Sequence, residues 1–127
     1  MLTFQSILKN CKTETDKKNI LRSKIEDMLN TVVRQISFFT FERLLHEQRI
    51  SGELTVDQIN NIWMETQSKS LGKAIKLNDD YKYLWSYIPH FIHSPFYVYA
   101  YAFGDCLVNS LYAKYELCSC QERRHMT

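Results

Sequence analysis

The chain has 127 residues, which is enough for one domain with a buried core. Its composition, 45% hydrophobic and 24% charged, excludes intrinsic disorder, and its formal net charge of +2 gives no indication of nucleic-acid binding. Three glycines and two prolines are too few for the many tight turns of a sandwich or barrel. We therefore expect an all-α fold made of long helices.

We expect neither a membrane-spanning stretch nor a signal peptide. No run approaches the roughly 18 apolar residues that a span requires, and the first residues lack a basic start and a cleavage site. We expect a cytoplasmic protein that has no membrane partner. Its four cysteines are then predicted to be reduced, and Cys118-Ser-Cys120 lacks the two-residue spacer of zinc and redox motifs.

In the first half of the chain, spacing predicts a short helix over residues 1–10 and a much longer one from Ile20. Thr13 is a candidate N-cap in the polar stretch between them, with Asp16 at the matching position. From Ile20 the apolar residues recur every three or four positions on two neighbouring stripes. The long helix is expected to contact neighbours on two sides and to end near Gly52.

The next helix has clearer limits. Thr55 and Gln58 have the spacing of a capping box, and Gly72 is positioned to end the helix. The aromatic stretch 73–87 shows no sustained period. We expect it to be an ordered connection lying on a helical surface.

The last helix is predicted to start with Ser94 as its N-cap and Pro95 in its first turn. It is apolar or aromatic around most of its circumference, so it is expected to be largely buried or to line a cavity. Periodicity is lost after Tyr115, and residues 118–127 are predicted to form a loose tail.

The histidines offer no complete metal site. His46-Glu47 begins like the zinc motif H-E-x-x-H, but position 50 is isoleucine, so His46 and Glu42 are interpreted as a structural pair. His90 and His93 have no convincing third ligand nearby.

Tyrosines follow the second pair of histidines. Tyr97 and Tyr101 share a helix face with Gly104, whereas Tyr99 points to another side. Phenols and an imidazole are good donors to a developing oxyanion, but tyrosines at helical spacing are also common core residues. On the residues alone, the second interpretation is favoured.

The longest informative string is IPHFIHSPFYVYAYAFG, residues 88–104. It closely resembles the C-terminal part of the oligoendopeptidase F family, which belongs to the thimet oligopeptidase group of zinc metallopeptidases. Residues 33–42, VRQISFFTFE, resemble the Arg-Gln…Phe-Glu helix of that family, and residues 52–55 resemble the turn that follows it. Residues 1–4, MLTF, resemble the segment just past the zinc site of that family, and the resemblance extends from Met1 to about Tyr115.

The resemblance implies a helical bundle-like C-terminal portion of a zincin-type oligopeptidase catalytic domain. In this family H-E-x-x-H and a later glutamate hold one zinc ion, the metal activates water, and short peptides are cleaved. His90 and Tyr97 match the catalytic positions that stabilise the oxyanion. Tyr99 and Tyr101 are weaker matches and are assigned to substrate binding, and His93 receives no role.

The chain departs from the family in lacking H-E-x-x-H and the third-ligand glutamate, both expected before Met1. Residues 1–115 are therefore interpreted as an incomplete catalytic-domain portion, and residues 116–127 as a divergent polar tail. We expect no zinc to bind this chain alone and no peptide hydrolysis by it.

A separate N-terminal half could complement the chain. The alternatives are a non-catalytic helical binding module and the relic of a split gene. In either case the apolar surface that the absent half once covered would favour association.

Overall fold

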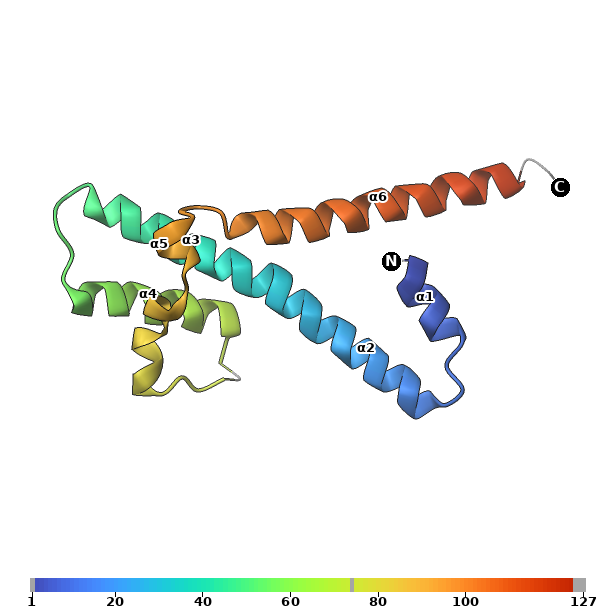
Figure 1. The fold of residues 1–127 in the computed structure, drawn as a ribbon, viewed down its shortest axis with the longest axis horizontal. Coiled ribbons are helices and arrows are strands. Elements are labelled where there is room, and N and C mark those ends of the chain that lie inside the picture. The colour runs from blue at the N-terminus through green and yellow to red at the C-terminus, as the bar shows by residue number, and fades with distance from the viewer. Residues whose placement is uncertain (1, 74, 125–127) are drawn as a thin grey trace.

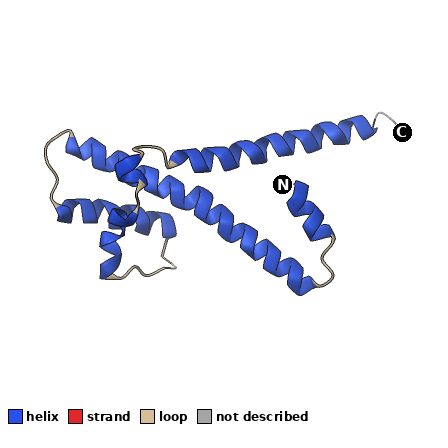
Figure 2. Ribbon diagram, in the orientation of Figure 1, coloured by secondary structure: helices blue, strands red, loops and turns tan. Residues whose placement is uncertain are grey.

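The computed structural model describes residues 2–73 and 75–124, and within these ranges every regular element is helical (Figures 1 and 2). The all-α prediction is therefore confirmed. In chain order the elements are α1 (Leu2–Lys9), α2 (Glu14–Met28), the π-helical turn η1 (Leu29–Val33), α3 (Arg34–Arg49), α4 (Val56–Leu71), the 3₁₀ helix η2 (Asp79–Tyr87), α5 (His90–His93) and α6 (Tyr99–Arg124).

The predicted long helix is a continuous rod formed by α2, η1 and α3 (Figure 1). It begins at Glu14, before Ile20, because the Thr13 hydroxyl caps it by accepting the Asp16 N–H at 3.1 Å. It contacts α4 and α6 through α3, as the two apolar stripes predict. Gly52 lies in the turn that follows and has a φ of 145°, which few other residues adopt.

Helix α4 lies antiparallel to α3 and has the predicted limits (Figure 1). Its capping box is complete, since the Thr55 hydroxyl accepts the Gln58 N–H at 3.3 Å and the Gln58 side chain accepts the Thr55 N–H at 2.8 Å. Gly72 ends the helix with a φ of 70°.

The core lies where α3, α4 and the segment before α6 meet. Its buried cluster contains Phe38, Phe41, Ile62, Trp63 and Val98. The 3₁₀ helix η2 is fastened to α4 at two points: the indole of Trp63 donates to the Tyr81 carbonyl at 2.9 Å, and that of Trp85 donates to Asn60 Oδ1 at 2.8 Å. The prediction of an ordered connection on a helical surface is therefore confirmed for η2.

The predicted start of the last helix is wrong. Ser94 and Pro95 lie in a turn after α5, and α6 begins only at Tyr99. A helix starting at Pro95 is interrupted because Phe96 adopts a φ of 60° and Val98 is fully buried in the core. The chain must change direction there to place Val98.

Two further predictions for this helix are also wrong: that it is largely buried, and that it gives way to a loose tail from residue 118. Apolar side chains along α6 are widely exposed, among them Phe103 at 62% and Leu111 at 60%. The helix diverges from α2 and contacts only part of the bundle (Figure 1), so much of its circumference has no neighbour. The backbone stays helical to Arg124, which contradicts a loose tail over 118–124; residues 125–127 lie outside the described structure.

Cys11, Cys106 and Cys118 are free thiols, and the Cys120 side chain lies outside the described residues. None of the helices described combines the length and apolarity that a membrane crossing demands.

Candidate oxyanion-binding site

Three of the side chains singled out from the sequence meet beside the start of α6. His90 comes from α5, Tyr97 from the turn, and Tyr101 from the first turn of α6. His90 Nε2 lies 3.0 Å from the Tyr101 hydroxyl. The Tyr97 ring lies parallel to the His90 ring at 6.5 Å and edge-on to the Tyr101 ring at 5.7 Å.

The local chain path explains this arrangement. Helix α5 ends at His93, and the turn over residues 94–98 returns the chain toward His90. Tyr97 precedes α6, but the Ala100 N–H donates to its carbonyl at 2.9 Å and so extends the turn toward the helix. The i,i+4 relation between Tyr97 and Tyr101 therefore still places the two rings together.

Tyr99 lies apart from this cluster. Its ring contacts Phe39 of α3 edge-on, with ring centroids 5.9 Å apart. The sequence spacing predicts Tyr99 on another side of the helix from Tyr97 and Tyr101, and its ring does lie on another side in the structure. No described contact joins Tyr99 to His90.

The cluster can donate hydrogen bonds outward. Tyr97 and Tyr101 are 52% and 42% exposed, and the Tyr97 hydroxyl has no hydrogen-bond partner among the described residues. When His90 Nε2 carries the proton it donates to the Tyr101 oxygen, which leaves the phenolic proton of Tyr101 free for another acceptor. Two phenol donors on one small surface are suited to an oxygen that gains negative charge.

The remaining histidines do not join the cluster. The His46 ring contacts Phe96 with ring centroids 4.8 Å apart, and His93 is exposed on α5. Glu42 bonds the Phe96 backbone N–H at 2.7 Å. The predicted pairing of Glu42 with His46 is therefore replaced by a shared contact with the turn, which sequence spacing alone could not reveal.

The described residues contain no zinc site. Among them, no group of three or more histidine, cysteine, aspartate or glutamate side chains could hold a metal ion. The donor set does not fit the zinc centre that the resemblance implies, so no chemical step is assigned to a metal on this part of the molecule.

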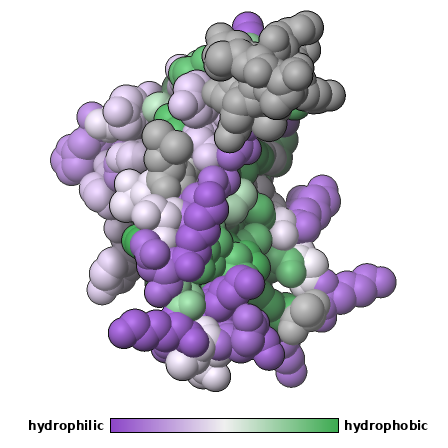
Figure 3. Space-filling model, turned by 90° about the vertical axis from the view of Figure 1, so that its right-hand side faces the viewer, coloured by the Kyte–Doolittle hydropathy of each residue, from purple (hydrophilic) through white to green (hydrophobic). Residues whose placement is uncertain are grey.

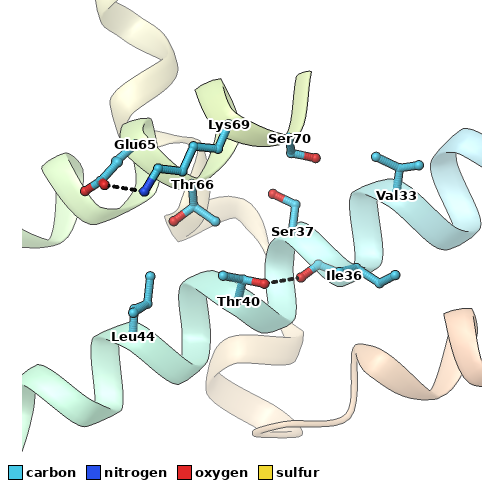
Figure 4. A pocket seen from close by; sticks show the side chains of 9 residues that line it. All are labelled: Val33, Ile36, Ser37, Thr40, Leu44, Glu65, Thr66, Lys69 and Ser70. Atoms are coloured by element: carbon cyan, nitrogen blue, oxygen red, sulfur yellow. Dashed lines mark hydrogen bonds and ion pairs between the residues drawn. The ribbon is translucent and has the colours of Figure 1, made fainter. Parts of the chain in front are cut away.

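A separate pocket of about 390 Å³ lies between α3 and α4 (Figure 4). Its walls carry Val33, Ile36 and Leu44 together with four hydroxyl side chains, and the Glu65–Lys69 ion pair lies at 2.6 Å beside them. Two of the hydroxyls already donate to backbone carbonyls of their own helices, Thr40 to Ile36 and Thr66 to Ile62. The pocket is a groove between helices, and its two charged side chains, Glu65 and Lys69, are paired with each other.

The described residues thus form an all-helical unit with a histidine–tyrosine cluster beside its last helix. The model of Peptidase family M3 matches residues 1–119, and the chain belongs to this family, which is a family of zinc metallopeptidases. The resemblance to oligoendopeptidase F is thereby confirmed.

The curated relatives are much longer than this chain. The plasmid oligoendopeptidase F of Lactococcus lactis subsp. cremoris is 32% identical over 121 residues, which cover 94% of this chain and 20% of the relative. The oligopeptidase PepF of Bacillus subtilis is 34% identical over 111 residues, 87% of this chain and 16% of the relative. The oligoendopeptidase F homolog of Borreliella burgdorferi is 37% identical over 108 residues, which cover 84% of this chain and 18% of the relative. The chain thus spans about one fifth of these relatives or less, and no solved structure matches it.

Proposed function

We propose that this chain is the C-terminal portion of a zinc-dependent metalloendopeptidase that cleaves short peptides. His90 and Tyr97 stabilise the oxyanion, Tyr99 and Tyr101 contact the substrate, and the zinc ligands and general base lie on another part of the enzyme. The observation that supports this proposal is the contact of His90 with Tyr97 and Tyr101 within the string that resembles the family. Alone the chain is inactive, and the assembled enzyme acts in the cytoplasm.

The chemistry of these residues is electrostatic. A phenol or imidazole N–H aimed at the carbonyl oxygen gains strength as that oxygen becomes negative, so it lowers the barrier rather than only tightening binding. In the resting cluster the 3.0 Å contact with His90 Nε2 holds the Tyr101 phenol beside Tyr97. His90 donates to the oxyanion when its Nε2 proton exchanges the Tyr101 oxygen for the substrate oxygen. Removal of one oxyanion donor typically costs about 100- to 1,000-fold in rate.

The partner is the N-terminal portion of a family M3 peptidase. Apolar side chains of the long rod line a pocket of about 520 Å³ between the rod and α6, and one of them, Met28, is 41% exposed. On α6, Val108 is 56% exposed. Figure 3 looks at the end where α2 and α6 diverge and shows apolar residues gathered in the middle of this face between hydrophilic ones. Apolar patches of this kind mark interfaces, and the chain spans only a fifth of its relatives.

The test is cleavage of a quenched fluorescent peptide with zinc, with and without a separately expressed N-terminal portion carrying H-E-x-x-H. We expect activity only in the mixture, and a loss of about 100- to 1,000-fold in kcat for Tyr97→Phe or His90→Ala. Tyr87→Phe is the matched control, because it removes the same hydroxyl from a side chain that is 85% exposed on η2.

Two outcomes would contradict the proposal. Zinc-supported cleavage by the isolated chain would show that the catalytic machinery is not on another part. A folded mixture without activity would favour the second candidate, a non-catalytic helical module. The exposed rings of Tyr97 and Tyr101 support that candidate, which would bind peptides equally well with and without zinc.

A further inference from the structure

Glu42 is an unusual residue to find in the core of this chain. Its side chain is buried with 1% exposure on α3, among aromatic residues. One carboxyl oxygen accepts the Phe96 N–H at 2.7 Å, across 54 residues of sequence, and the other is buried without a partner among the described residues. Burial of a carboxyl with so few hydrogen bonds is unfavourable, so the contact with Phe96 is the one gain that the structure shows for it.

Phe96 itself is in an unfavourable backbone conformation. Its φ of 60° makes it the one non-glycine residue with a positive φ in the described ranges. Bulky L-residues rarely adopt this region, and they stay there only when surrounding contacts fix them. Two contacts do so here: the hydrogen bond that the Phe96 N–H donates to Glu42, and the fully buried side chain of Val98 two residues later.

The conformation of Phe96 decides where Tyr97 goes. Tyr97 is the next residue, and its ring lies parallel to His90 and edge-on to Tyr101. If Phe96 relaxed to an ordinary φ, the chain direction at Tyr97 would change and the ring would leave His90. Glu42 is thus linked to the cluster through one hydrogen bond and one backbone angle.

We propose that Glu42 is a positioning residue that holds the Phe96 backbone in its left-handed conformation and so places Tyr97 against His90 and Tyr101. Its relevance to catalysis rests on the proposed function. The effect of Glu42 on the geometry of the cluster does not rest on the proposed function, because it can be measured in the isolated chain.

Three variants separate positioning from simple loss of stability. Glu42→Met keeps a side chain of similar size but removes the acceptor, whereas Glu42→Gln keeps an acceptor oxygen. Gln67→Met is the matched control, because Gln67 is 3% exposed and its hydrogen bond to Ser37 at 2.8 Å is buried away from the turn.

The first measurement is the set of nuclear Overhauser contacts between the rings of Tyr97, His90 and Tyr101 in the isolated chain. We expect Glu42→Met to lose them, and Glu42→Gln and Gln67→Met to retain them. In the mixture with the N-terminal portion, Glu42→Met should lower kcat by at least about tenfold, while Glu42→Gln and Gln67→Met stay within about twofold of the parent. Retained ring contacts in folded Glu42→Met would overturn the proposal.

Amide exchange of Phe96 in the unaltered chain is the second measurement and does not depend on any variant folding. If Glu42 holds this N–H, we expect it to exchange at least about tenfold more slowly than the amides of exposed turn residues. Exchange as fast as theirs would overturn the proposal. A failure of the proposed function gives a different result. In that case no mixture would be active, with the parent chain or with any variant, but the ring contacts would still be lost in Glu42→Met and kept in Glu42→Gln.

Discussion

The two ends of the long rod have similar sequence periodicity but very different surroundings. Around α3 the rod is covered by α4, by α5 and by the start of α6, and Phe41 and Trp63 are almost completely buried. Along α2 no residue is buried, and Ile25 and Met28 are 57% and 41% exposed. The apolar residues of α2 therefore have a spacing that suits a neighbour which the described structure does not provide.

The contacts of the exposed region are local and weak by comparison. The Arg22–Glu26 ion pair of α2 joins side chains that are 79% and 57% exposed, and such pairs contribute little to stability. Helix periodicity thus indicates which face is apolar, but the long-range contacts of α3 and α4 decide which part of that face is covered. We expect the exposed region to depend on a partner and the packed region to be stable by itself.

The largest expected effect is that of Trp63→Ala in the packed region. This substitution removes a ring that contacts Phe38, Phe41 and Tyr81, and also a hydrogen bond to the Tyr81 carbonyl. Truncation of a buried tryptophan typically lowers the free energy of unfolding by about 3–5 kcal/mol. Urea denaturation of the isolated chain measures this loss in the free energy of unfolding.

The matched variant in the exposed region is Leu111→Ala on α6, whose side chain is 60% exposed. We expect it to change the free energy of unfolding by no more than about 0.5 kcal/mol. Equal losses in the two variants would mean that α6 is part of the same cooperative core, and the comparison between the two regions would then be wrong.

Local signals predicted the helices well where the signal and the element lie within a few residues of each other. The caps at Thr13 and Thr55 and the stop at Gly72 depend only on neighbours in sequence, and all three are found in the structure. The start at Ser94 and Pro95 was wrong because the burial of Val98 and the contact of Phe96 with α3 override the local preference of proline for a first helical turn.

The residues of the candidate site also differ in whether nearby sequence could predict them. The spacing of Tyr97 and Tyr101 predicted their shared face, and the family resemblance singled out His90. The contribution of Glu42 could not be predicted, because its partner lies 54 residues away and is a backbone N–H with no sequence signature. The π-helical turn η1 had no sequence signal either.

Removal of the two threonine N-caps should have effects of intermediate size, and these effects should differ between the packed and the exposed region. Thr55→Ala removes a cap from a helix of the core, and we expect a loss of about 1 kcal/mol in the free energy of unfolding with a lower Tm. Thr13→Ala removes the same kind of cap from α2, which has no buried residue. We expect it to speed amide exchange in the first turn of α2 and to leave the Tm of the core unchanged. A lower Tm for Thr13→Ala would show that the whole rod unfolds as one unit.

The smallest expected effect concerns the contact between α1 and α6. The Glu116 carboxylate accepts hydrogen bonds from the Tyr112 hydroxyl at 2.7 Å and from the Gln5 side chain at 3.1 Å. These bonds favour the charged form and lower the pKa of Glu116, mainly through Tyr112 and then through Gln5. The same bond raises the pKa of Tyr112, because ionisation of the phenol would remove its donor.

The signs of these two shifts define a pH window for the contact. A carboxyl with a lowered pKa adds stability above its unfolded-state pKa and loses it as the pH falls through the lower, folded-state value. A phenol with a raised pKa adds stability below its unfolded-state value and loses it as the pH rises through the higher one. We therefore expect the amides of α1 to exchange slowly near neutral pH, after correction for the intrinsic rate, and to lose protection in acid, where Glu116, the acceptor for Gln5, takes up a proton. The alkaline loss concerns the Tyr112–Glu116 bond, which lies within α6. Glu116→Gln should remove the acid limb while leaving the exchange of the core amides in α4 unchanged. Acid loss of protection that persists in Glu116→Gln would mean that another group docks α1 on α6. The effect will be small because the residues are exposed, yet it would show that this contact can open without disturbing the packed region.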